Sequence, residues 1–261
     1  MPEILLESAV APGIVRLTLN RPNERNALDR ALIEALAAAI AHHATHPPTR
    51  VMLIAGSGSA FCAGADLAAM RALGTVSYAE NLSEARRLAD LLAALHECPK
   101  PSIACVHGAA IGGGLGLVAA CDVAIAAADA RLRLPEVRLG LAPAVISPYV
   151  LEAIGPRQAR RYALTGEMID AERARQIGLV HEVVAPDALA AAALALADEI
   201  ASGAPTALAA TKALFADARR TEPSTATAER TARVLAELRA GPEAQEGLAA
   251  AVERRIPAWR R

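Results

Sequence analysis

The chain has 261 residues, of which 54% are hydrophobic and 2% aromatic, and its 27 Lys and Arg nearly balance its 28 Asp and Glu. A chain of this length can bury a substantial core of Ala, Leu, Val and Ile. Its net charge of -1 offers no excess of positive charge that would indicate binding to nucleic acid or to an anionic membrane. The apolar stretch nearest to membrane length, residues 103–128, is interrupted by glycines, His107 and Asp122, so no membrane partner is expected.

The first half of the chain predicts alternating strands and helices. An opening hairpin is followed by an Ala-rich helix that Asp29 can cap, and proline at 47 and 48 ends that helix. The predicted strands are residues 4–6, 14–19, 51–54, 102–106 and 123–126, and the predicted helices are residues 30–44, 81–97 and 113–120. This alternation indicates an α/β core.

Beyond Pro143 the pattern predicts helices almost throughout. Five prolines stand where a helix can begin: Pro156, Pro186, Pro205, Pro223 and Pro242. No long linker or repeat divides the chain, so a second independent domain is not predicted. The four cysteines contain no C-x-x-C pair and no secretory pattern opens the chain, which favours a reducing cytoplasm.

Residues 61–67 form a loop of small side chains that lets a ligand approach the backbone. Gly64 can adopt a positive φ without a Cβ penalty, which would turn the Ala65 N–H towards a ligand oxygen. Taken alone, the segment is better explained as a surface turn.

Residues 111–116 contain three consecutive glycines between a strand and a helix. A helix N-terminus offers unpaired N–H groups and the positive end of the helix dipole, so the Gly113 N–H can stabilise an oxygen that gains negative charge. Close helix–strand packing is one alternative. A second is the dinucleotide fingerprint G-x-G-x-x-A at residues 114–119, but it lies mid-chain after a loop and leaves residues 61–67 without a role.

Glu136 follows a proline in an apolar segment, where partial desolvation would raise its pKa into a range useful for proton transfer. The alternative is a surface carboxylate paired with Arg133 or Arg138. His42, His43 and His46 gather at a helix end without a carboxylate or cysteine at ligand spacing, so a solvated terminus is preferred to a metal site.

Together these segments resemble the enoyl-CoA hydratase/isomerase family, also called the crotonase superfamily. The likeness rests on residues 21–28, 61–67, 107–114, 121–122, 135–141 and 174–184 in that order. It implies an α/β fold that is a spiral of ββα repeats over residues 1–200 with the acyl-CoA pocket. A helical trimerisation region over residues 201–261 would belong to the same unit, in a homotrimer or homohexamer.

The resemblance also implies site residues. The Ala65 and Gly113 N–H groups would form an oxyanion hole for the thioester oxygen, Glu136 would be catalytic, and no metal or redox cofactor is expected beyond the coenzyme A of the substrate. The implied substrate-binding residues are Arg25, Ala27, Ala63, Asp66, Leu67 and Gly116.

One departure from the family pattern concerns Gly116. Family hydratases commonly carry two catalytic glutamates, and Gly116 occupies the position of the first. The resemblance still favours a hydratase, closest in look to bacterial enzymes for branched, carboxylated substrates such as methylglutaconyl-CoA or carboxygeranoyl-CoA. Water would be activated by Glu136 itself, by Ser147 or by the substrate's own carboxylate. A Δ3,Δ2-enoyl-CoA isomerase using Glu136 alone and a non-catalytic acyl-CoA-binding protein are the alternatives.

Overall fold

The computed structural model describes residues 3–218 and 224–260, and their strands form two sheets. The larger sheet has the order β1-β2-β3-β5-β7-β10, and the smaller has the order β4-β6-β8-β9. The strands of the larger sheet are β1 (Leu5–Ala11), β2 (Ile14–Leu19), β3 (Val51–Gly56), β5 (Ser102–Val106), β7 (Val123–Ala127) and β10 (Glu182–Val184). Those of the smaller sheet are β4 (Ala60–Cys62), β6 (Ala109–Ile111), β8 (Arg131–Arg133) and β9 (Met168–Asp170).

The chain passes repeatedly from the larger sheet to the smaller one. β3, β5 and β7 are parallel neighbours in the larger sheet, and each is followed by β4, β6 or β8, which are parallel neighbours in the smaller sheet. A helical segment then follows each pair, so the repeating unit is ββα. Because β4, β6 and β8 are parallel, the segments that follow them meet at one edge of the smaller sheet.

Ten α-helices lie in the part of the chain that the structure describes. They are α1 (Arg30–Thr45), α2 (Leu67–Leu73), α3 (Tyr78–Glu97), α4 (Gly113–Ala120), α5 (Ser147–Thr165), α6 (Ala171–Gln176), α7 (Leu189–Ala201), α8 (Pro205–Ala218), α9 (Thr225–Ala240) and α10 (Pro242–Glu253). Short 3₁₀ helices are η1 (Pro22–Glu24), η2 (Glu136–Leu139), η3 (Pro186–Ala188) and η4 (Ala258–Arg260).

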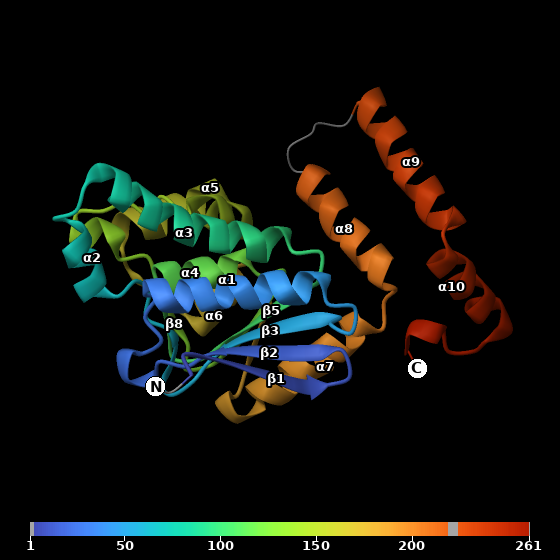
Figure 1. The fold of residues 1–261 in the computed structure, drawn as a ribbon, viewed down its shortest axis with the longest axis horizontal. Helices are drawn as coiled ribbons and strands as arrows, with labels where there is room; N and C mark the ends of the chain where they lie inside the picture. Colours follow the sequence, from blue (N-terminus) through green and yellow to red (C-terminus); the bar gives the residue numbers. More distant parts are fainter. Residues whose placement is uncertain (1–2, 219–223, 261) are drawn as a thin grey trace.

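Helices cover both faces of the larger sheet, with α1, α3 and α4 on one side and α7 on the other (Figure 1). Side chains alternate along the strands accordingly. Leu17 and Ile54 join the core beneath α1 and α3, whereas Ile14 and Leu53 join a second cluster with Ala193 of α7. Burial on both faces explains why β3 and β5 read as continuous apolar runs.

Helices α8, α9 and α10 extend beyond the core as an arm (Figure 1). Arg50 ties the base of this arm to the sheet, because its guanidinium donates to the carbonyls of Ala201, Gly203 and Trp259. Five large apolar side chains of the arm and its end are more than half exposed: Phe215, Leu235, Leu248, Val252 and Ile256.

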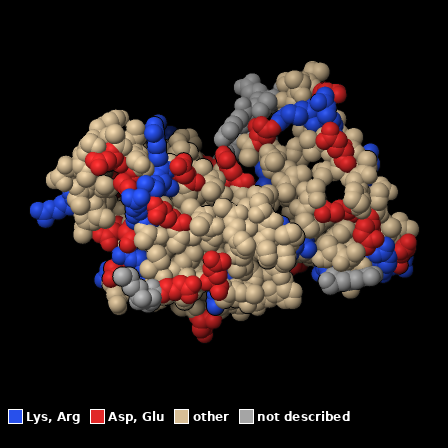
Figure 2. Space-filling view, viewed as in Figure 1, with Lys and Arg blue, Asp and Glu red and all other residues tan. Residues whose placement is uncertain are grey.

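The face seen in Figure 2 carries interspersed charges of both signs, as the net charge of -1 leads one to expect. Among the described residues no single helix has the length and apolar composition to cross a membrane, and one bent pair, α7 with α8, passes by composition only. The inner face of α7 packs on the larger sheet.

The α/β class predicted from the sequence is confirmed, as are the opening hairpin and the cap of α1, where Asp29 accepts from the Leu32 N–H. Pro186, Pro205 and Pro242 each begin a helical segment, and Pro156 begins the second half of α5 after a kink at Gly155. Pro223 lies outside the described residues.

The structure differs from the sequence-based expectations at four points. Residue 67 begins helix α2, and α3 starts three residues earlier than expected, where Ser77 and Glu80 form a capping box. Strands β9 and β10 interrupt the region predicted to be almost wholly helical. The smaller sheet was missed because its strands have only three residues each, too few to show a period of two.

Candidate active site

Three segments meet at the edge of the smaller sheet where its parallel strands end. Ala65 follows β4, Gly113 follows β6 and Glu136 follows β8. Ligand sites in parallel sheets lie outside the carboxyl ends of the strands. The fold therefore brings the three residues predicted to carry the chemistry to one place.

The two glycine-rich segments touch each other directly. Gly64 has φ +92°, and a Cβ on it would lie 2.6 Å from the Ile111 carbonyl oxygen and 3.7 Å from the Gly113 nitrogen. A side chain at Gly114 would overlap the Cys62 carbonyl of β4. Glycine is required at both positions, because each lets one backbone approach another.

The orientation of the Ala65 N–H follows from its pairing with Leu28. The Leu28 N–H donates to the Gly64 carbonyl at 2.7 Å, and the Asp66 N–H donates to the Leu28 carbonyl at 3.1 Å. These bonds flank Ala65 in a parallel bridge, so the N–H of Ala65 itself points away from Leu28.

Gly113 is the first residue of α4, and Gly112, with φ +51°, occupies the N-cap position. The first N–H groups of a helix have no partner within the helix and lie at the positive end of its dipole. Within residues 3–218 and 224–260, neither the Ala65 nor the Gly113 N–H donates to another backbone carbonyl outside regular elements. Both are available to a ligand.

The residues predicted to line the coenzyme A entrance also lie together. The Ala63 N–H donates to the Arg25 carbonyl at 2.9 Å, so residues 25–28 run beside residues 63–66. Asp66 caps α2 by accepting from the Ala68 and Ala69 N–H groups, and these bonds hold the pKa of its carboxyl below the usual value. Leu67 is 64% exposed and Ala27 is buried.

Asn26 joins residues 21–28 to residues 57–61 and was not singled out by sequence reasoning. It is fully buried with φ +56°, and its side-chain amide donates to the Ser57, Ala60 and Phe61 carbonyls while its oxygen accepts from the Arg21 N–H. Asparagine tolerates the left-handed region better than most residues, which is the one sequence signal available.

Glu136 starts η2, and its Oε1 lies 3.1 Å from the position that a Cβ on Gly112 would take. Its Oε2 is buried and has no hydrogen-bond partner among the described residues. Burial raises the pKa of the Glu136 carboxyl. A desolvated, unpartnered carboxyl next to Gly112 and Gly113 is a competent proton carrier.

The alternative ion pairs of Glu136 are absent from the described part of the chain. Arg133 donates instead to the Gly166 carbonyl at 2.6 Å, and Arg138 donates to the Thr165 carbonyl at 3.0 Å. Arg133 thereby joins the end of α5 to β8, and Arg138 joins it to η2. The interpretation of Glu136 as a surface ion-pair partner is wrong.

The raised pKa of Glu136 predicts a pH-dependent stability. The folded protein holds this proton more tightly than the unfolded chain, so the free energy of unfolding falls as pH rises from about 4.3 through the raised value. Glu136→Gln removes the titration. We expect the variant to be more stable than the parent at pH 8 by about 1 kcal/mol, the low end for an unpartnered buried group, with a smaller gain at pH 4. Denaturant unfolding at both pH values measures this, and equal gains would contradict it.

Gly116 lies one turn into α4 and is buried against α5 and α3. A Cβ there would overlap Ile146 Cγ2, lie 3.0 Å from Ile146 Cβ and lie 3.6 Å from Leu92 Cδ1. The position of the family's first glutamate is thus closed by an apolar side chain. Ser147, the other proposed water activator, donates its hydroxyl proton to the Ala144 carbonyl.

Gly116→Ala is expected to destabilise the protein despite the better helix propensity of Ala. Overpacking costs about 1–3 kcal/mol, against a gain of about 1 kcal/mol from replacing a helical glycine. Ile146→Ala removes the Cγ2 atom that the new methyl group would overlap. A double-mutant cycle should therefore give a favourable coupling of at least about 1 kcal/mol, and additive effects would show that Ile146 does not close this position.

The position of Gly114 and Gly116 also excludes the dinucleotide interpretation. Both glycines lie inside α4 and are buried, instead of opening a turn from a strand. A pyrophosphate has no access to their backbone.

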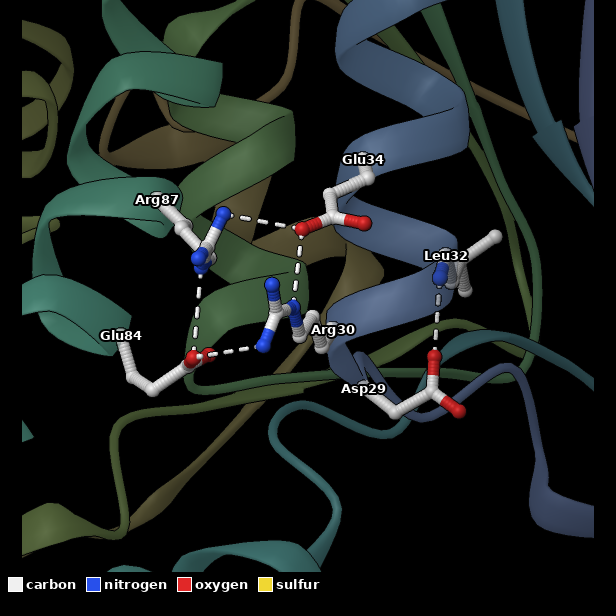
Figure 3. A network of polar contacts seen from close by, with 6 residues as sticks. All are labelled: Asp29, Arg30, Leu32, Glu34, Glu84 and Arg87. Carbon is white, nitrogen blue, oxygen red and sulfur yellow. Dashed lines mark hydrogen bonds and ion pairs between the residues drawn. The ribbon is translucent and has the colours of Figure 1, made fainter. Parts of the chain in front are cut away.

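Helices α1 and α3 are fixed to each other above the site by four charged residues (Figure 3). Arg30 and Arg87 each bind both Glu34 and Glu84, at N–O distances of 2.9 to 3.7 Å. Single exposed ion pairs are weak, but a closed network of four is a more specific contact. Leu88 belongs to α3, and Leu28 lies two residues before α1. Both leucines lie next to Gly113.

None of the predicted site residues lines the cavity of about 490 Å³ between α4, α5 and α8, which includes His96, Asp122 and Lys212. The candidate site lies instead at the ends of the parallel strands of the smaller sheet.

Comparison with known proteins gives consistent matches along the chain. The family model described as Enoyl-CoA hydratase/isomerase matches residues 10–261. The 2,3-dehydroadipyl-CoA hydratase of Escherichia coli is 35% identical, over 94% of this chain and 94% of that protein. The mevalonyl-coenzyme A hydratase of Aspergillus fumigatus is 34% identical, over 98% and 94%. The crystal structure of an enoyl-CoA hydratase from Shewanella pealeana has a TM-score of 0.95 at 38% identity, covering 98% of this chain and 96% of that one.

Proposed function

The chain belongs to the enoyl-CoA hydratase/isomerase family, and from that premise we propose that it adds water reversibly to an α,β-unsaturated acyl-CoA. The observation that carries the proposal is the Oε2 of Glu136, which is buried without a partner beside the start of α4. A carboxyl held this way is suited to moving a proton at a bound thioester.

In the proposed reaction the thioester oxygen lies between the N–H groups of Ala65 and Gly113. Negative charge develops on that oxygen as the water oxygen bonds to C3. Glu136 takes a proton from this water and delivers one to C2, so that the enolate collapses to the 3-hydroxyacyl-CoA. Each oxyanion donor contributes about 10²–10³ in rate, and the proton carrier about 10²–10⁴. The reaction is redox-neutral, and the proposed backbone N–H groups of Ala65 and Gly113 take the place of a Lewis acid at the thioester oxygen. We therefore propose that it needs neither a redox cofactor nor a metal.

We propose that the coenzyme A portion enters past Arg25, Ala27, Ala63, Asp66 and Leu67. The pairing of residues 25–28 with residues 63–66 supports this, because it makes one continuous rim next to Ala65. Gly116 would contribute by its lack of a side chain, which leaves the apolar Ile146 behind the acyl group.

The test is incorporation of oxygen from labelled water. Purified protein is incubated with crotonyl-CoA in water enriched in ¹⁸O, and the acyl-CoA products are analysed by mass spectrometry. The proposal expects a 3-hydroxyacyl-CoA that carries the label at C3. Conversion without label contradicts it.

A Δ3,Δ2-enoyl-CoA isomerase is the second candidate, supported by the apolar closure of Gly116. An isomerase moves one proton between carbons and needs one carboxyl, whereas a water nucleophile is commonly held by two. With 3-enoyl-CoA in deuterated water, this reading expects migration of the double bond with carbon-bound hydrogen exchange and no added oxygen. Binding of CoA esters with neither conversion would leave the non-catalytic acyl-CoA-binding protein.

We propose a branched or carboxylated acyl group as the preferred substrate. The Escherichia coli relative is named for 2,3-dehydroadipyl-CoA, which carries a second carboxyl. A panel of straight, branched and carboxylated enoyl-CoA esters, compared by kcat/KM, tests the preference. The proposal is contradicted if neither the branched nor the carboxylated esters exceed the straight-chain esters in kcat/KM.

We propose a homotrimer or homohexamer in the cytoplasm. The exposed apolar side chains of Phe215, Leu235 and Val252 on the arm support association, because an isolated chain leaves them in water. Three of the four cysteines are buried as free thiols, which suits a reducing compartment. Native mass spectrometry at micromolar concentration should show a multiple of three, and a stable monomer or dimer would contradict the assembly.

A further inference from the structure

Three histidines gather at the end of α1, far from the site at its start. His42 and His43 lie in the last turn of α1, and His46 is its C-cap residue. One ligand atom of each lies within 4.8 Å of the others, and the rings of His42 and His46 stack with centroids 5.1 Å apart.

The fold supplies the carboxylate that the local sequence lacks. Glu7 of β1 places its Oε2 2.9 Å from the Nε2 of His43. Helix α1 packs against β1, so a residue 36 positions away in sequence joins the cluster. The local sequence has no carboxylate at ligand spacing, which was the reason to prefer a solvated helix end. Glu7 supplies that carboxylate from β1.

A buried hydroxyl orients two of the three imidazoles. The Oγ1 of Thr49 lies 2.8 Å from His43 Nδ1 and 3.1 Å from His46 Nδ1, and Thr49 is 4% exposed. A hydroxyl oxygen has two lone pairs and can accept from both rings. In the metal-bound state, Nδ1–H groups that donate to Thr49 would leave each Nε2 lone pair for the ion, which is how a second shell prepares histidines to bind a metal. The proton that His43 Nε2 donates to Glu7 in the metal-free state leaves that nitrogen when the ion binds.

We propose that His42, His43, His46 and Glu7 form a binding site for a divalent transition-metal ion of the Zn²⁺ class. Three imidazoles and one carboxylate suit Zn²⁺, whereas Mg²⁺ and Ca²⁺ prefer all-oxygen sites. The C-terminal end of a helix dipole and the charge of Glu7 both favour a cation at this place.

The cluster must contract to hold the ion. The ligand atoms of the three histidines now lie within 4.8 Å of one another. Tetrahedral Zn²⁺, with bonds of about 2.0–2.1 Å, requires its ligand atoms to lie closer together than that limit. The movable groups are the exposed His42 and Glu7, whose side chain is 46% exposed, while the buried His43 and Thr49 stay fixed.

Four protein ligands would leave no open coordination position, so the site is structural. Helix α1 has 16 residues and rises about 1.5 Å per residue, which separates the metal from the acyl-CoA site by roughly 24 Å. The bound ion would join β1 to the end of α1 and stabilise the folded state by mass action. This inference does not depend on the proposed function.

The experiment uses tag-free protein treated with EDTA and dialysed, because a purification tag would itself bind the metal. Calorimetric titration with ZnCl₂ should show one ion per chain, together with a rise in Tm, and MgCl₂ should show neither. Titration with CoCl₂ should give the intense visible bands of tetrahedral cobalt.

Variants assign the ligands. His46→Gln and Glu7→Gln change partly exposed side chains and should each weaken Zn²⁺ binding at least about tenfold, and Thr49→Val should weaken it about 10–100-fold through the second shell. His107→Gln, a histidine outside the cluster, is the matched control and should bind as the parent does. Circular dichroism confirms that each variant is folded.

Three results would overturn the proposal. These are no Zn²⁺ binding by the parent, equal affinity in the cluster variants and the parent, or the same loss of affinity in His107→Gln as in His46→Gln.

Discussion

Glu136→Gln is expected to lower kcat by at least about 10² while the KM for the acyl-CoA changes little. The substitution keeps the shape of the side chain and removes the group that carries the proton. Within residues 3–218 and 224–260, Glu136 is the one carboxyl group with a buried, unpartnered oxygen. Ile146 closes the position of Gly116, and the hydroxyl of Ser147 donates to the Ala144 carbonyl, so we expect neither position to replace Glu136.

The control for this variant is Glu182→Gln, which makes the same chemical change at an exposed residue of β10. It should retain the parental kcat. Steady-state kinetics with crotonyl-CoA and 3-enoyl-CoA give both constants for each reaction. Wild-type turnover by a folded Glu136→Gln protein would remove Glu136 from the mechanism, whichever of the two reactions the protein performs.

The pH experiment on the same variant separates the two roles of Glu136. If its carboxyl is desolvated for catalysis, the variant that loses activity should gain stability at pH 8, because the unpartnered charge is gone. Loss of both activity and stability would instead indicate that the substitution disturbs η2.

The central strands of the larger sheet, β2, β3, β5 and β7, were predictable because each has five or six largely buried residues. Val51 to Ile54 and Ser102 to Val106 form apolar runs that periodicity detects. The smaller sheet was not predictable from one sequence, since a three-residue strand carries no periodic signal. Yet β4, β6 and β8 are the elements that bring Ala65, Gly113 and Glu136 together.

The site residues were predictable through local chemistry and the resemblance, and their surroundings were not. A positive φ could be expected at Gly64, because glycine is the residue that adopts positive φ values freely. The closure of Gly116 by Ile146 and the approach of Glu7 to His43 each join residues at least 30 positions apart. Such contacts are set by tertiary packing, which local pattern does not contain.

Gly113→Pro is expected to lower kcat by about 10²–10³, the effect of removing one oxyanion donor. Gly113 is the first residue of α4, the helical position that tolerates proline best, so the fold should survive the loss of this N–H.

Gly113→Ala is the matched control for this substitution. It adds a Cβ that would lie 3.0 Å from Leu28 Cδ1, as proline does, but it keeps the N–H. The activity lost by Ala therefore measures crowding against Leu28, and the further loss in Pro measures the hydrogen bond. Circular dichroism and Tm establish folding, and kcat/KM with crotonyl-CoA gives the comparison. Equal activity of the two variants would show that the Gly113 N–H does not bind the thioester oxygen and that the donor must be sought elsewhere along residues 111–116.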